Sequence, residues 1–188
     1  MILDPLKTAI LTLDLQSGIL AMGEGYQSVI PNAAKIVDFA RTKNYPIIHI
    51  GLGFSEGHPE VPVFESLFLR AKQNNLFVKN TPSAEFHRSI IQPGDMVIYK
   101  QRISAFTENH LNLTLRARGI ENLVLFGVST SGIVLATVVR AFDLDFKLTI
   151  IEDACFDADE EVHRILFEKV FAKRGTVIST NTFVAEAA

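Results

Sequence analysis

Cysteine is almost absent from this chain, and its scarcity limits how the protein is held together. Cys155 is the single cysteine among 188 residues, so a disulfide within the chain and a zinc site built of several cysteines are excluded. A chain of this length buries roughly 70% of the surface that its unfolded form exposes, so its stability requires neither disulfides nor a metal. A lone thiol is typical of a reducing compartment, and we expect a cytoplasmic location.

The sequence also lacks runs of one charge and long apolar stretches. Lys and Arg number 18 against 21 Asp and Glu, which gives a formal net charge of −3, and neither sign forms a run long enough to attract a polyanion or an anionic membrane. Nucleic acid is therefore not an expected partner. Charged residues and a proline interrupt the apolar segment 1–15, so we expect neither a signal peptide nor a membrane span there.

Short apolar runs alternate with segments of helical period. Runs typical of buried strands occupy residues 7–13, 47–53, 96–100, 122–128, 146–153 and 176–180. The spacing predicts helices over 31–44, 63–73, 109–118, 130–145 and 159–175, a long loop over 54–62, and no regular element over 74–92. Strands alternating with helices indicate a parallel sheet covered on both faces. The expected fold is α/β, a single-domain, Rossmann-like three-layer sandwich with a six-stranded parallel sheet, spanning residues 1–188.

Two charged residues stand directly at the ends of predicted strands. Asp14 ends the first strand and Lys100 ends the third. In open parallel sheets the functional site lies beyond the carboxyl ends of the strands, which makes both residues candidates. Burying either charge alone is costly, so we expect them to pair across the sheet. A catalytic pair and a purely structural ion pair both fit this position.

The third candidate is the turn Gly127–Ile133, where the fourth strand runs directly into a helix. Such a turn presents unpaired backbone N–H groups at the positive end of the helix dipole, which attracts a carboxylate or an oxyanion. Ser129, Thr130, Gly132 and Ile133 are therefore candidates for binding substrate. The alternative is that Thr130 or Ser131 simply caps the helix.

Three motifs in this order are similar to those of the isochorismatase-like hydrolase superfamily. They are D-L-Q from Asp14, K-x-R-x-S-A-F from Lys100, and G-V-S-T-S-G-I-V-L-A-T from Gly127, followed by E-D-A-C from Glu152 and E-V-H from Glu161. The resemblance covers nearly the whole chain. It implies hydrolysis of small molecules, a six-stranded parallel sheet, and homodimers or larger homo-oligomers. In members similar to nicotinamidase an Asp, a Lys and a Cys form a triad, and Asp14 and Lys100 match the first two.

The third triad position departs from that pattern. The resemblance puts the nucleophilic cysteine at residue 133, which is Ile133 here. An isoleucine has nothing to ionise, so amide hydrolysis through a thioester is not available at this position. Cys155 is interpreted as a packed thiol. Ser129 is an alternative nucleophile, but no histidine lies near it in sequence to act as its base.

Isochorismatases themselves supply a cysteine-free alternative. The resemblance implies that an Asp protonates a vinyl ether before water attacks, and Asp14 fits this role if burial raises its pKa. Lys100 would then orient the substrate, and Gln16 is a further candidate for binding it. Those enzymes carry a small residue at position 133, where the branched Ile133 fills part of the pocket.

No metal and no cofactor are expected. Nicotinamidase-like members hold a metal through Asp-x-His and a second His after the second strand, whereas this segment offers only Glu56 and His58. His49, inside the second predicted strand, is interpreted as a core or pocket histidine. Among the 14 phenylalanines, we expect Phe54, Phe64 or Phe106 to line the site.

Two hypotheses for function follow. One is a small-molecule hydrolase that works with Asp14 and Lys100 and without a cysteine. The other is a catalytically inactive member that binds a small molecule or takes part in an oligomer, which Ile133 favours. An open cavity at Asp14 and Lys100 supports the first hypothesis, and a cavity closed by Ile133 and phenylalanines would contradict it.

Overall fold

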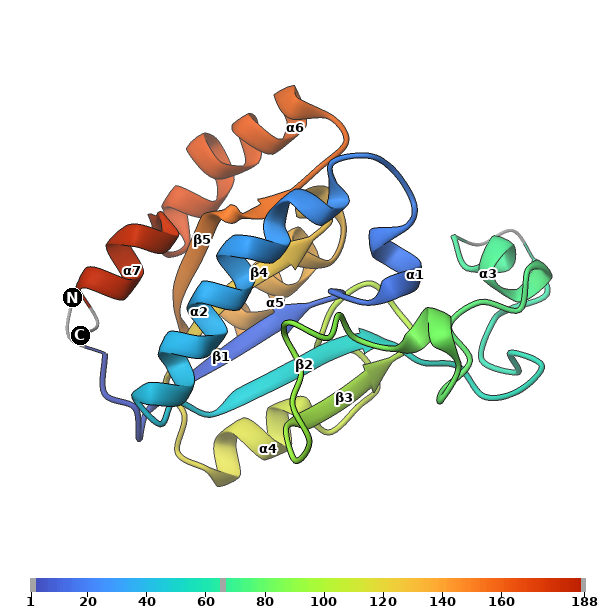
Figure 1. The fold of residues 1–188 in the computed structure, drawn as a ribbon, viewed down its shortest axis with the longest axis horizontal. Helices are drawn as coiled ribbons and strands as arrows, with labels where there is room; N and C mark the ends of the chain where they lie inside the picture. Colours follow the sequence, from blue (N-terminus) through green and yellow to red (C-terminus); the bar gives the residue numbers. More distant parts are fainter. Residues whose placement is uncertain (1–2, 65–66, 187–188) are drawn as a thin grey trace.

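A six-stranded sheet forms the centre of the protein. The computed structural model describes residues 3–64 and 67–186. The strands are β1 (Thr8–Leu13), β2 (Ile47–Leu52), β3 (Met96–Lys100), β4 (Asn122–Val128), β5 (Lys147–Phe156) and β6 (Thr176–Ile178). Their order is β3-β2-β1-β4-β5-β6 and every pairing is parallel (Figure 1). The predicted α/β class and strand number are confirmed.

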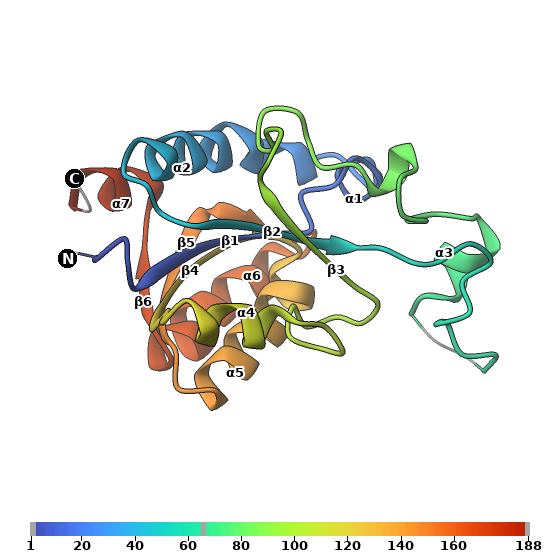
Figure 2. The same cartoon turned by 90° about the horizontal axis from the view of Figure 1, so that it is seen from below.

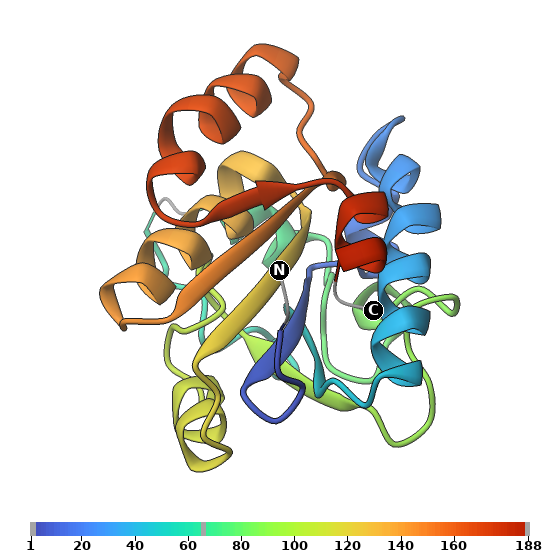
Figure 3. The same cartoon turned by 90° about the vertical axis from the view of Figure 1, so that its left-hand side faces the viewer.

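Helices cover both faces of this sheet. They are α1 (Ser17–Leu20), α2 (Ile30–Thr42), α3 (Leu69–Gln73), α4 (Leu111–Ala117), α5 (Leu135–Asp143), α6 (Glu160–Ile165) and α7 (Thr180–Glu186). Figure 2 shows α1, α2 and α7 on one face and α4, α5 and α6 on the other, which is the predicted three-layer sandwich. Figure 3 shows α7 beside α2, with which it is in contact. None of the helices in residues 3–64 and 67–186 has the length and apolar content that crossing a bilayer requires.

Burial on both faces explains the composition of the central strands. All six residues of β1 are buried. Ile10 and Leu11 point to opposite faces of the sheet, and both are 0% exposed. A strand that is covered on both sides needs apolar residues throughout rather than an alternating pattern. The continuous apolar run in the sequence therefore predicted this strand correctly.

Two of the predicted helices are interrupted. The segment predicted as one helix over 130–145 begins with a π-helical turn, Thr130–Val134, in which Gly132 has φ −94° and ψ −108°, and only then continues as α5. Similarly, α6 is followed by a π turn (Leu166–Val170) and a 3-10 turn (Phe171–Lys173). Side-chain spacing predicts helical period but not a local change in backbone hydrogen bonding.

Strand register brings the functional candidates to one edge. Leu13 lies beside Ile50 and Gly127, while Leu52 lies beside Lys100. Gly127 has φ +145°, and a Cβ there would collide with the carbonyl oxygen of Leu13. Glycine thus permits the close approach of β1 and β4 just before both strands end.

Candidate functional site

A buried ion pair stands at the carboxyl edge of the sheet. Lys100 Nζ, at the end of β3, donates a hydrogen bond of 2.9 Å to Oδ2 of Asp14, the residue after β1. Asp14 is 6% exposed and Lys100 is 1% exposed. The left-handed backbone of Asp14, with φ +54°, is tolerated by aspartate better than by most residues. The expected pairing across the sheet is confirmed.

The Asp14 carboxyl group is only partly satisfied. Its Oδ1 atom is buried and has no hydrogen-bond partner among the described residues. Burial raises the pKa of Asp14 above its ordinary value, while the charge and hydrogen bond of Lys100 oppose this increase. A carboxyl group in this state has a greater tendency to hold a proton than an exposed aspartate, as a general acid requires.

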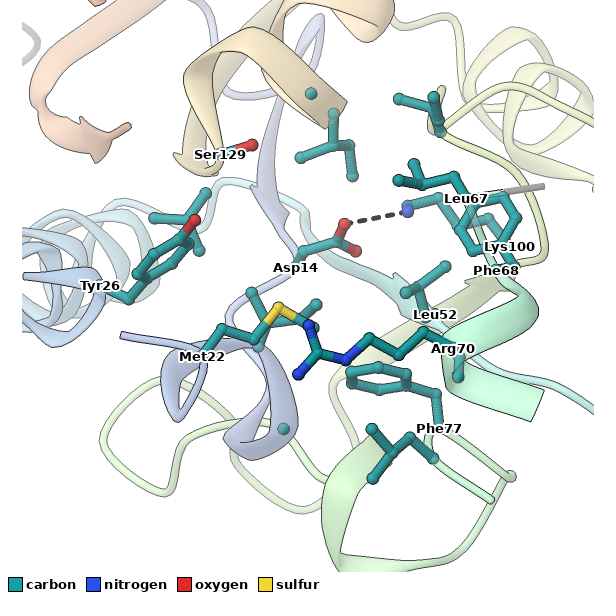
Figure 4. A pocket seen from close by; sticks show the side chains of 18 of the residues that line it. Asp14, Met22, Tyr26, Leu52, Leu67, Phe68, Arg70, Phe77, Lys100 and Ser129 are labelled. Atoms are coloured by element: carbon teal, nitrogen blue, oxygen red, sulfur yellow. Dashed lines mark hydrogen bonds and ion pairs between the residues drawn. The ribbon is translucent and has the colours of Figure 1, made fainter. Parts of the chain in front are cut away.

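A cavity of about 710 Å³ opens onto this pair (Figure 4). Its walls come from the β1, β2 and β3 ends, α1, the α3 region and the turn after β4. The lining residues are Asp14, Gly18, Ile19, Ala21, Met22, Tyr26, Leu52, Leu67, Phe68, Arg70, Ala71, Leu76, Phe77, Lys100, Ile103, Val128, Ser129, Gly132 and Ile133. The volume and the mainly apolar lining are typical of a small-molecule site.

The turn after β4 lines the cavity, and several of its backbone N–H groups already have partners within the protein. Ser131 N–H donates to Asp157 Oδ2 at 2.7 Å, so a carboxylate of the protein already occupies this end of the helix. The N–H groups of Gly132 and Val134 both donate to the carbonyl oxygen of Ser129. These three donors are therefore not free to bind a substrate anion in this structure.

Two predicted substrate-binding side chains lie outside the cavity lining. Gln16 is fully buried, donates to the carbonyl oxygens of Leu52 and Ala84, and accepts from Leu52 N–H. Thr130 is buried and its hydroxyl is 2.9 Å from Nδ1 of His163. Their polar atoms therefore already have partners within the protein, and in this structure neither side chain faces the cavity.

Histidines that the sequence left open have partners within the protein. His49 lies between Thr12 and Asp95, with its two ring nitrogens 2.8 and 3.1 Å from their oxygens. His58 Nε2 is 2.7 Å from the carbonyl oxygen of Leu76. Across residues 3–64 and 67–186 there is no group of three or more His, Cys, Asp or Glu side chains placed to hold a metal.

The aromatic residues that line the cavity differ from those expected. Phe54 is fully buried, Phe64 is 71% exposed, and Phe106 packs on Phe146 with ring centroids 6.0 Å apart. The cavity is lined instead by Phe68 and Phe77. Phe77 belongs to the segment 74–92, for which no regular element was predicted. Phe68 belongs to the helix predicted over 63–73, and nothing in the sequence indicates where that helix lies relative to the cavity.

Arg70 is the functional candidate that sequence reasoning missed. It belongs to α3, which lies with its flanking loops beyond the ends of β2 and β3 in Figures 1 and 2. Its side chain extends toward the middle of the cavity in Figure 4. A short helix was predicted over 63–73, and the structure has α3 at Leu69–Gln73. The position of α3 over the cavity depends on the path of the irregular loops on either side, which the sequence does not give.

A model of the isochorismatase domain matches residues 8–182. The chain belongs to the isochorismatase family. It is 32% identical to an uncharacterised isochorismatase family protein, YwoC of Bacillus subtilis, over 181 residues, which cover 96% of this chain and 94% of that protein. It is 30% identical to the ureidoacrylate amidohydrolase RutB of Acinetobacter baylyi, with 97% and 84% covered. It is 29% identical to a probable inactive nicotinamidase of Arabidopsis thaliana, with 84% of each covered.

Solved structures agree on the fold of this isochorismatase family member. A cysteine hydrolase from Pseudomonas syringae pv. phaseolicola superposes with a TM-score of 0.88 at 18% identity, covering 100% of this chain and 95% of that one. An isochorismatase family protein from Desulfovibrio vulgaris superposes with a TM-score of 0.85 at 24% identity, covering 96% and 97%. These likenesses support the three-layer α/β architecture.

The thiol chemistry of the family is not available in this cavity. Ile133, at the position where the resemblance puts the cysteine, lines the cavity and is 3% exposed. Cys155 lies in β5 outside the lining, and burial raises the pKa of its thiol to about 12. A thiol with so high a pKa carries almost no thiolate near pH 7, so Cys155 does not replace the missing nucleophile.

Proposed function

We propose that this chain is a small-molecule hydrolase that works without a cysteine nucleophile. Asp14 acts as the general acid and then as the general base, and Lys100 fixes its orientation and charge. The observation that carries the proposal is the buried pair at an open cavity, with Asp14 Oδ1 left without a partner among the described residues. A hydrogen-bonding atom without a partner at such a place favours contact with a ligand.

The chemistry follows from the protonation state of Asp14. A protonated Asp14 donates its proton to an acid-labile bond, such as the vinyl ether of the cysteine-free members that the chain resembles. Water adds to the cation that forms, and the Asp14 carboxylate takes a proton from that water as it adds. The resulting hemiketal then breaks down to an alcohol and a carbonyl compound. One water is consumed and Asp14 returns to its starting state.

Bonds that require a covalent intermediate fit this cavity less well. Ser129 lines it, but the hydrogen bonds of the described residues include none that joins its hydroxyl to a histidine or a carboxylate. Without such a base a serine is a weak nucleophile near pH 7. An acid-labile bond requires only an acid and a water, which the cavity can accommodate.

Ile133 favours a second candidate, a catalytically inactive member that retains the cavity for binding. An Arabidopsis relative is named a probable inactive nicotinamidase. A cavity closed by Ile133 would contradict the hydrolase, whereas the open cavity of about 710 Å³ is compatible with it and leaves turnover to distinguish the two candidates.

The test is a screen of the wild-type protein against vinyl ethers, ureides and small amides. Asp14→Asn serves as the blank, and Asp143→Asn, at an exposed position on α5, serves as the matched control. We expect turnover of a vinyl ether that is lost in Asp14→Asn and unchanged in Asp143→Asn. Turnover that survives Asp14→Asn would contradict the assigned role, and silence with every compound would favour the inactive binding protein.

The proposal also covers the location, the oligomeric state and the partners of the protein. We propose a cytoplasmic homodimer or larger homo-oligomer, organised as one domain over residues 1–188, that uses no metal or cofactor and binds neither nucleic acid nor a membrane. Three exposed apolar side chains, Val63, Phe64 and Leu67, support an interface between copies. Sedimentation of the purified protein tests the oligomeric state.

A further inference from the structure

We propose that Arg70 is the anion-binding residue of the cavity and that the ligand carries a carboxylate. This proposal deepens the proposed function, on which it rests for the reacting end of the ligand. The occupant is then an amphipathic carboxylic acid, with its charged end at Arg70, its apolar part along the cavity walls and its acid-labile bond at Asp14.

The charges that line the cavity point to an anion. Three lining residues have a carboxyl, amino or guanidinium side chain, namely Asp14, Lys100 and Arg70. Asp14 and Lys100 are paired with each other at 2.9 Å, so their charges compensate. No hydrogen bond or ion pair of the Arg70 side chain is found among the described residues. The guanidinium is thus a cation without an internal partner at a cavity whose other charges are matched.

The surroundings of Arg70 strengthen its attraction for a planar anion. Leu67, Phe68 and Phe77 line the cavity with it, and Figure 4 shows the Arg70 side chain running past Phe77 toward Met22. Apolar walls lower the local dielectric once a ligand displaces water, which increases the energy of a charge pair. A guanidinium matches a carboxylate with two parallel hydrogen bonds, a geometry that no other side chain offers.

The exposed position of Arg70 gives it a role at the entrance. Arg70 is exposed, whereas Asp14 and Lys100 are buried. An incoming anion therefore meets Arg70 before it reaches the pair. The protein as a whole repels anions weakly, because its formal net charge is −3, so a preference for carboxylates has to come from a local cation.

The test measures binding, so it does not depend on turnover. Benzoate, phenylacetate, phenylpropanoate and phenylbutanoate are titrated calorimetrically beside their neutral primary amides into the wild-type protein, Arg70→Met and Arg164→Met. Arg164 is an exposed arginine on α6, paired with Glu168, so its replacement changes the net charge of the protein by the same amount. The melting temperature of each variant verifies that it is folded.

We expect the wild-type protein to prefer at least one carboxylate over its amide by about tenfold. Arg70→Met abolishes this preference and Arg164→Met retains it. Equal preference in wild type and Arg70→Met would overturn the proposal, as would a wild-type protein that binds none of the four acids. A protein with the preference but without turnover would contradict only the acid–base function, and one with turnover but no preference would contradict only the role of Arg70.

Discussion

Replacing Lys100 by methionine tests whether Asp14 depends on its partner. Met retains much of the length of the lysine side chain but removes the ammonium that lies 2.9 Å from Asp14 Oδ2. The carboxylate then has to stay charged without compensation or take up a proton. At pH 7 the proton costs about 4 kcal/mol for an acid with an ordinary pKa near 4. This cost is the upper limit of the electrostatic loss of stability, within the range of about 3–5 kcal/mol for breaking buried pairs.

The loss depends on pH in a defined direction. The pKa of Asp14 is raised by burial in the folded protein, so the stability from this group is fully present below about pH 4 and is lost as pH rises through the raised pKa. Without Lys100 that pKa rises further. The deficit of Lys100→Met relative to wild type is therefore small at pH 4 and grows by up to about 1.4 kcal/mol per pH unit.

The assay is urea denaturation at several values between pH 4 and pH 7. The exposed pair Lys7–Glu121 provides the control, because Lys7→Met breaks a solvent-screened pair and should cost far less than Lys100→Met. The double variant Asp14→Asn, Lys100→Met has no charge left at this pair and should be more stable at pH 7 than Lys100→Met alone. Two results would refute the reasoning. One is that Lys100→Met loses as much unfolding free energy at pH 4 as at pH 7, and the other is that the double variant loses as much as the two single variants added together.

Three further predictions concern other parts of the chain. Ile133→Cys puts a thiol on the cavity wall, so iodoacetamide should label it in the folded protein and leave Cys155 unlabelled, because burial raises the pKa of Cys155 to about 12; mass spectrometry locates the label, and labelling of Cys155 would contradict this account. Burial lowers the pKa of His49, although Asp95 opposes this shift. The stability that the neutral ring contributes is therefore present above about pH 6.5 and is lost as pH falls. His49→Gln should make the melting temperature fall less between pH 7 and pH 5, and an unchanged fall would contradict this role of His49. Gln16→Leu leaves three backbone groups unpaired and should cost about 3 kcal/mol or more in urea denaturation, whereas a weaker affinity for phenylalkanoates without loss of stability would restore its role in substrate binding.

The sequence was most informative where charge interrupts a buried strand. Asp14 and Lys100 each end an apolar run, and parallel topology brings the carboxyl ends of all strands to one edge. Their pairing could therefore be predicted although 86 positions separate them. The same logic identified Ser129, Gly132 and Ile133, which line the cavity.

Sequence reasoning failed where contacts between distant segments determine which polar groups are already paired. The pattern at the turn after β4 gives no sign that Asp157 lies beside Ser131 N–H, 26 positions away. The buried hydrogen bonds of Gln16 depend on Leu52 and Ala84 in other segments. Arg70 lies in the short helix that was predicted over 63–73, but the place of that helix over the cavity depends on the irregular loops on either side rather than on local preference. The C-terminal helix α7 was not predicted.

The most direct test of the central claim is the pH profile of kcat/KM for the best substrate of the screen. If protonated Asp14 is the general acid, kcat/KM falls as pH rises through an inflection above pH 4, because burial raises the pKa of Asp14. Asp14→Asn should lose both the activity and the inflection. A kcat/KM that stays constant or increases with pH across this range would contradict acid catalysis by Asp14.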